Sequence, residues 1–193
     1  MIARSLSFLA AALASLILMV TGPEGPRSGT MPAAYANEPS REYLIKAAFL
    51  YNFAKFTEWP ASAFADRGAP LHLCVLGEDP FGAALESIEG REIRGRAVAV
   101  LRIASLRVAA NCHLLFISDS EEARLRKILE SLRDRPVLTV ADMPNFARAG
   151  GIISLKTLEE KIRFEINNGT AKRAGLKLSS KLLNLAEIMP SQN

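Results

Sequence analysis

The chain has 193 residues, of which 49% are hydrophobic and 23% are charged, and its formal net charge is +4 at pH 7. This length suits one domain with a single core, and the sequence contains no internal repeat and no low-complexity segment. The positive charge is too small and too dispersed to favour a nucleic-acid-binding protein.

The N-terminal segment has the pattern of a secretory signal peptide. Arg4 supplies a positive charge, and residues 6–20 form an unbroken run of small and apolar side chains. The run is short for a membrane span and lacks a basic stop-transfer flank, and no cysteine near it would carry a lipid anchor. Because residues 34–36 fit an A-x-A cleavage site, we predict a signal peptide over residues 1–36 and a periplasmic domain over residues 37–193.

Residues 46–60 (KAAFLYNFAKFTEWP) contain the densest group of aromatic side chains. They predict a helix that Ser40 caps and Pro60 ends, because the residue before a proline is pushed out of the α region. Lys46 and Lys55 lie away from the apolar face of this helix. The apolar side chains at helical spacing are Ile45, Phe49, Phe53 and Phe56.

Two interpretations of this helix stay open. In the simpler one, its aromatic side chains pack on a sheet as part of the core. In the other, Tyr51, Lys55 and Trp59 belong to a surface that binds a partner. Replacing Trp59 would separate the two, because a core residue supports stability and an interface residue supports binding.

The middle of the domain is predicted from apolar runs that alternate with helical patterns. Strands are expected at residues 71–76, 97–103, 112–118 and 136–140. The second and third are continuous apolar runs, as in strands buried on both faces. Asp79 is expected to cap a helix that ends at Gly90, and Ser118 with Glu121 forms a predicted capping box for a helix reaching Leu132.

The pattern changes near the C-terminus. Residues 152–155 and 162–166 predict a hairpin with a six-residue loop and one wet face, at the edge of the sheet. Asn167 or Asn168 is expected to cap a short helix. Ser179 is expected to cap a last helix, from which Ile188 packs inward. Together the elements predict an α/β fold: a single three-layer domain with a mainly parallel sheet flanked by helices, and an antiparallel edge hairpin near the C-terminus.

The two cysteines allow three interpretations. In an oxidising compartment, Cys74 and Cys112 are expected to form a disulfide. The alternatives are free thiols and a metal site with His72 and His113. Because adjacent strand residues point to opposite faces, Cys112 and His113 could not both reach one ion unless the strand ended there.

Other polar residues lie where open α/β sheets bind ligands. Gly77 and Asp79 follow the first strand and Asp142 follows the fourth, so they could line a crevice at the carboxyl ends of the strands. Turn and capping roles explain the same residues more simply. No phosphate-binding loop, metalloprotease motif or nucleophile–histidine arrangement is evident, so no cofactor is expected, and a binding or regulatory module is favoured over an enzyme.

Several blocks of the chain occur in the order found in a known family. They are KAAFLYNFAKFTEWP (46–60), LCVLGEDPFG (73–82), CHLLFIS (112–118), PVLTVADMPNFARAGGIISL (136–155), FEIN (164–167) and AGLKLSSKLLNLA (174–186). Together they resemble the YfiR/HmsC family of exported bacterial proteins, and the resemblance covers nearly all of the predicted mature chain.

The resemblance implies a function that residue spacing alone does not. It implies a dimeric periplasmic repressor that binds the sensor domain of an inner-membrane diguanylate cyclase, lowers cyclic-di-GMP synthesis and limits biofilm formation. An outer-membrane lipoprotein would sequester the repressor. Cys74 and Cys112 match a cysteine pair of the family, whereas residues 136–155 contain no counterpart of a second disulfide.

Other classes of function stay open beside this one. The partner could be a sensor kinase, or the chain could be a periplasmic solute-binding protein that uses Gly77, Asp79 and Asp142. A thiol or metal enzyme built on the cysteines and histidines is the third class.

Overall fold

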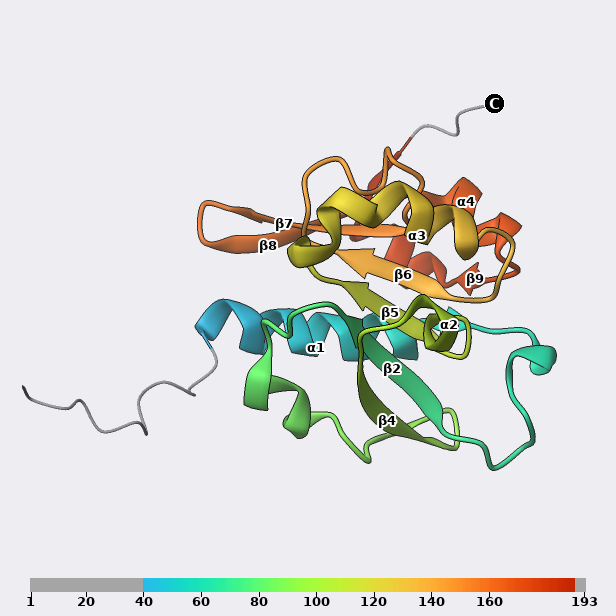
Figure 1. The fold of residues 1–193 in the computed structure, drawn as a ribbon. Helices are drawn as coiled ribbons and strands as arrows, with labels where there is room; N and C mark the ends of the chain where they lie inside the picture. Colours follow the sequence, from blue (N-terminus) through green and yellow to red (C-terminus); the bar gives the residue numbers. More distant parts are fainter. Residues whose placement is uncertain (1–39, 190–193) are drawn as a thin grey trace, which may run out of the picture. The chain divides into compact units, whose positions relative to one another are not determined.

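In the computed structural model, residues 40–189 are described, and the predicted signal peptide lies outside them. The larger sheet has the strand order β10-β8-β7-β6-β5-β2-β4-β3, and β1 pairs with β9 in a small second sheet (Figure 1). The strands are β1 (Thr57–Glu58), β2 (Leu71–Leu76), β3 (Glu92–Ile93), β4 (Arg96–Ile103), β5 (Leu114–Ile117), β6 (Leu138–Ala141), β7 (Ile153–Leu158), β8 (Lys161–Ile166), β9 (Lys177–Leu178) and β10 (Glu187–Ile188).

The helices are short apart from the first. The α-helices are α1 (Arg41–Lys55), α2 (Leu106–Ala109), α3 (Leu125–Ser131), α4 (Asn168–Arg173) and α5 (Ser180–Leu183). The 3-10 helices are η2 (Ala61–Ala63), η3 (Gly82–Ser87) and η4 (Asp119–Arg124). In the part of the chain that the structure describes, no helix is long and apolar enough to cross a membrane.

The predicted fold class is confirmed. Strands β4, β2, β5, β6 and β7 run parallel to one another, whereas β3 pairs antiparallel with β4, and β7 and β8 form an antiparallel hairpin. One core packs α1 on the sheet, with Phe53 against Phe164 at 5.1 Å between ring centroids. A second core joins α2 and α3 to the sheet and contains Cys74, Ile128 and Phe146. Helices thus supply apolar side chains to two separate cores.

The long helix differs from its prediction at both its face and its end. Ile45 is 38% exposed, whereas Lys46 is only 3% exposed and belongs to the buried face. The helix ends at Lys55 rather than at Pro60, because Thr57 and Glu58 leave it to pair with β9. The predicted cap is confirmed, since Ser40 Oγ accepts a hydrogen bond from Tyr43 N–H.

Other elements differ in kind or burial. The segment after β2 is a 3-10 helix, although Asp79 accepts the Phe81 N–H at 2.8 Å, as a capping residue would. The capping box at Ser118 is wrong: its hydroxyl donates to Asp119, and Glu121 pairs with Arg124. Whether a capping residue such as Asp79 or Ser118 starts an α-helix therefore depends on how the turn after it packs.

Two predictions of buried side chains, one for a strand and one for a helix, are corrected by the structure. Strand β4 is half exposed rather than buried on both faces, and only the two-residue strand β3 lies beyond it in the sheet. Ile188 does not pack inward from a helix; it lies in β10 and is 49% exposed. Asn167 and Ser179 do cap α4 and α5 through their side chains, as predicted.

The hairpin loop is two residues long, because β7 extends to Leu158 and β8 begins at Lys161. Its residues, Glu159 and Glu160, have φ angles of 49° and 60°. This left-handed pair is the conformation that Asn-Gly adopts most readily. We expect Glu159→Asn combined with Glu160→Gly to raise the free energy of unfolding by about 1 kcal/mol, as measured by urea denaturation. An equal gain from Glu159→Ala alone would contradict this reason.

Candidate partner-binding surface

The Cys74–Cys112 disulfide is present, as predicted, and both residues are buried. It joins β2 to the segment between α2 and β5, and it lies in the core on the α3 side of the sheet. In the described residues, no group of three or more His, Cys, Asp or Glu side chains could hold a metal ion. The sulfur atoms are therefore bonded to each other and stabilise the scaffold.

His113 organises a buried cluster beside the disulfide. Its Nδ1 accepts a hydrogen bond from His72 N–H at 3.0 Å, so Nε2 carries the proton and donates to the Ala63 carbonyl at 3.1 Å. The Phe64 ring stacks on the imidazole at 4.2 Å between centroids. Trp59 Nε1–H donates to the His113 carbonyl at 3.1 Å, which fixes the indole. His113 is thus a structural centre, because its carbonyl binds Trp59 and its neutral imidazole stacks on Phe64.

Burial lowers the pKa of His113 to about 4, against an ordinary value of 6.5. The hydrogen bond to the Ala63 carbonyl opposes this lowering of the pKa, and the nearby His72 and Arg96 side chains contribute to it. Because the unfolded chain binds a proton at a higher pH than the folded chain, the stability contribution of neutral His113 is complete above pH 6.5. It falls as the pH decreases towards about 4.

We therefore expect the free energy of unfolding to decrease between pH 6.5 and about 4. Urea denaturation across this range should show a shallower pH slope for His113→Gln than for the wild-type protein. Titration of the His113 ring by NMR provides the direct check. A ring that gains its proton near pH 6.5 in the folded protein would refute the prediction.

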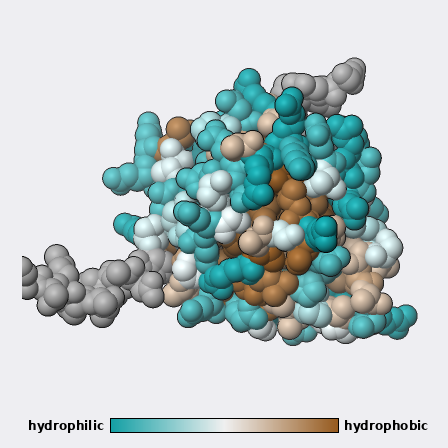
Figure 2. All heavy atoms as spheres, viewed as in Figure 1, coloured by the Kyte–Doolittle hydropathy of each residue, from teal (hydrophilic) through white to brown (hydrophobic). Residues whose placement is uncertain are grey.

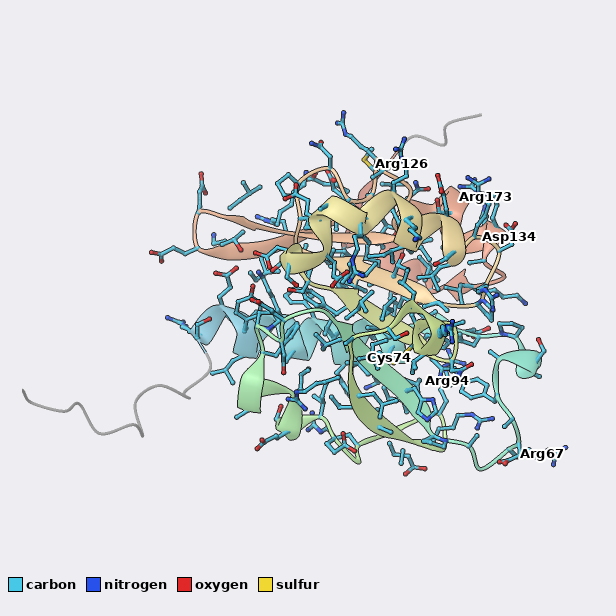
Figure 3. The ribbon with its side chains drawn as sticks, in the orientation of Figure 1. Arg67, Cys74, Arg94, Arg126, Asp134 and Arg173 are labelled. Carbon is cyan, nitrogen blue, oxygen red and sulfur yellow. A yellow bond between two sulfur atoms is a disulfide. The ribbon has the colours of Figure 1, made fainter. Side chains whose placement is uncertain are left out.

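The three side chains predicted to bind a partner lie near one turn. The Tyr51 hydroxyl donates to the Glu92 carbonyl at 3.3 Å, and the Arg91 guanidinium lies over the Tyr51 ring at 5.1 Å. Lys55 follows Tyr51 by one helical turn and is exposed. Trp59 lines a cavity of about 210 Å³ with Arg94 of the β3–β4 turn (labelled in Figure 3).

We call Tyr51, Lys55, Trp59, Arg91 and Arg94 the basic–aromatic surface. Arg94 is paired with Glu58 at 3.1 Å, and both side chains are about half exposed. An exposed pair of this kind contributes little to stability, so its charges remain available to a partner. The surface thus combines hydrogen-bonded aromatic rings with exposed cations. Sequence spacing indicated the three side chains of α1 and the segment after it, but not Arg91 and Arg94, which flank β3.

The predicted ligand crevice is filled by internal contacts. An added Cβ at Gly77, whose φ is 93°, would overlap the Ser120 hydroxyl. Asp79 accepts a charged hydrogen bond from Arg102 Nε at 2.6 Å. Asp142 accepts bonds from Lys46 Nζ at 2.5 Å and from the Tyr43 hydroxyl at 3.1 Å. A ligand at this edge would have to compete with these partners.

Residues of α1 complete the cluster at Asp142, and sequence reasoning missed them. Glu42 also binds Lys46 Nζ, at 2.6 Å, and this hydrogen bond lowers the pKa of Glu42. Burial, with Asp142, raises the pKa of Tyr43 well above its ordinary range. A lysine next to apolar helix positions was the available signal, because a buried ammonium requires an acidic partner.

An exposed apolar patch lies on the face of the sheet that carries α2 and α3. Leu101 of β4 and Val108 of α2 are 37% and 41% exposed. Leu101 neighbours Cys74 in the β2–β4 register, so the patch continues the disulfide-containing core to the surface. Figure 2 shows apolar side chains gathered in the centre of this view. This patch was also missed, because β4 was expected to be covered.

Comparisons with known proteins identify the family. Two solved structures resemble part of the chain, which spans about half the length of each. They are a conserved domain protein from Vibrio cholerae (11% identity, TM-score 0.46, covering 62% of this chain and 55% of that one) and an ABC domain in complex with L-Trp from Streptococcus pneumoniae (12%, 0.42, 61% and 54%). We draw no functional conclusion from likenesses this weak. A profile described as YfiR/HmsC-like matches residues 43–187, and the chain therefore belongs to the YfiR/HmsC-like family.

Proposed function

We propose that this protein represses an inner-membrane diguanylate cyclase by binding the periplasmic sensor domain of that enzyme. Residues 1–36 would direct export, and residues 37–193 would act in the periplasm, as a homodimer that an outer-membrane lipoprotein sequesters. The outcome would be low cyclic-di-GMP synthesis and little biofilm. Family membership supports this role, and the basic–aromatic surface is the observation on which the binding step rests.

The composition of this surface suits a protein partner. Tyrosine, tryptophan and arginine carry most of the binding energy in protein interfaces, whereas scattered lysines contribute charge steering. Trp59 is held by its bond to the His113 carbonyl, and Tyr51 by its bond to the Glu92 carbonyl. Side chains that are already ordered lose less conformational entropy when a partner binds. We expect an acidic region with an apolar centre on the sensor domain.

Repression requires no chemistry in this mechanism. A protein that binds only the inactive conformation of a sensor shifts the sensor population towards that conformation. A shift from mostly active to mostly inactive needs a difference in affinity of roughly 10⁴-fold between the two states. Binding must therefore discriminate between states and not merely be tight.

The first test is recovery of the partner. The protein should capture a membrane diguanylate cyclase from its own cell envelope, and added protein should lower cyclic-di-GMP synthesis by that cyclase in vesicles. Capture of a sensor kinase instead would mean that the protein regulates a kinase and not a diguanylate cyclase. Failure to capture any membrane protein would contradict the proposal.

The second test locates the interface. We expect Lys55→Glu combined with Arg94→Glu to weaken repression roughly tenfold or more, because two steering charges are reversed. Both side chains are exposed, so the melting temperature should hold. Lys172→Glu, an exposed change on α4, is the matched control. Loss of repression in Leu101→Glu but not in the double variant would move the interface to the apolar patch.

A further inference from the structure

A second cavity, of about 320 Å³, lies between α3, α4 and the start of β6. Its floor is apolar, and its rim is charged. The floor includes the buried side chains Leu132, Val137, Ile152 and Ala174. The rim includes Arg126, Arg133, Arg173, Glu130 and Asp134, three of which Figure 3 labels around α3 and α4. Its volume corresponds to roughly ten water molecules, at the lower end of small-molecule sites.

The arginines on this rim are without acidic partners. In residues 40–189, no carboxylate oxygen lies within 4.0 Å of the guanidinium nitrogens of Arg126, Arg133 or Arg173. Arg173 is instead oriented by a hydrogen bond from its Nη2 to the Thr170 hydroxyl at 2.8 Å. With Glu130 and Asp134 also on the rim, the lining has a net charge of +1, which favours a singly charged anion.

Two threonine hydroxyls that line the cavity also supply hydrogen-bond donors. Thr139 is buried in β6, and its Oγ1 accepts the Ile152 N–H at 3.0 Å. A hydroxyl that accepts through one lone pair can still donate its own proton. The Thr170 hydroxyl can likewise still donate its proton, because it accepts a hydrogen bond from Arg173. A ligand must therefore supply acceptor atoms near the threonines and arginines, and apolar surface against the floor.

We propose that this cavity binds a small amphipathic monoanion, namely a carboxylate with a medium-length aliphatic or aryl tail. The carboxylate lies between Arg133 and Arg173, where a guanidinium can form two parallel hydrogen bonds. The tail lies on Leu132, Val137 and Ile152, from which it displaces water. This site shares no residue with the basic–aromatic surface, so the proposal does not depend on the repressor function.

Octanoate is the probe, and calorimetric titration of the purified protein is the measurement. We expect saturable binding with one octanoate per chain. Arg173→Gln should weaken it roughly tenfold or more, since a charge-assisted bond is lost. Ala149→Trp, which fills the exposed mouth of the cavity, should abolish binding. Arg148→Gln, a neighbouring exposed arginine that does not line the cavity, should leave binding unchanged.

Two comparison probes separate the charge from the tail. Acetate has the charge without the tail, and 1-octanol has the tail without the charge, so neither should bind measurably. The melting temperatures of all three variants should match that of the wild-type protein, which checks that they remain folded. Absence of octanoate binding at roughly millimolar concentration would overturn the proposal. Equal binding of 1-octanol, or unchanged octanoate affinity in Arg173→Gln and Ala149→Trp, would overturn it as well.

Discussion

Lys46→Met is expected to lower the free energy of unfolding by about 3–5 kcal/mol. The Lys46 ammonium is buried and lies 2.5 Å from Asp142 and 2.6 Å from Glu42. Methionine fills similar volume but leaves the largely buried Asp142 carboxylate without its cation. Among the described side chains of α1, only the Tyr43 hydroxyl would still donate a hydrogen bond to Asp142. The loss arises because a desolvated charge is left uncompensated.

Urea denaturation at neutral pH measures this loss directly. The melting temperature should fall by roughly 2–4 °C for each kcal/mol in a domain of this size. Lys55→Met, an exposed change on the same helix, is the matched control and should stay within about 0.5 kcal/mol. Lys46→Met combined with Asp142→Leu should recover much of the stability, because both charges are then absent. If the single and double variants were equally unstable, packing rather than charge would be the cause.

Removing the disulfide by Cys74→Ala with Cys112→Ala should lower the free energy of unfolding by about 4 kcal/mol. The bond closes a loop with a sequence separation of 38 residues. Without it, the unfolded chain gains conformational entropy, and two buried side chains become smaller. The double variant is the appropriate change, because a single replacement leaves a free thiol in the core.

Guanidinium denaturation of the two proteins gives the difference. Since Cys74 and Cys112 are both buried, dithiothreitol should reduce the bond only when the protein opens. Mass spectrometry of alkylated thiols should therefore show reduction accelerating with denaturant. Rapid reduction of the folded protein, with loss of partner binding, would instead make the disulfide a redox switch and contradict a purely structural role.

The sequence alone determined the features that depend on neighbouring residues. Apolar runs located β2, β5 and β6, because strands in the middle of a parallel sheet are covered on both faces. Ser40, Asn167 and Ser179 were recognised as caps because a cap bonds to the backbone within three residues. The order of several blocks indicated the family, and the number of cysteines with the export pattern favoured the disulfide.

Only the tertiary structure decided the features that depend on distant residues. Lys46 is buried because Asp142, 96 positions along the chain, lies beside it, and helical periodicity contains no such information. The helix ends early because Thr57 and Glu58 pair with β9, more than a hundred residues away. Apolar runs look alike whether or not another element covers them, so the exposure of Leu101 could not be predicted from the sequence. The arginines beside Trp59 and around the second cavity likewise came together only through folding, because charge at the surface has no fixed spacing in sequence.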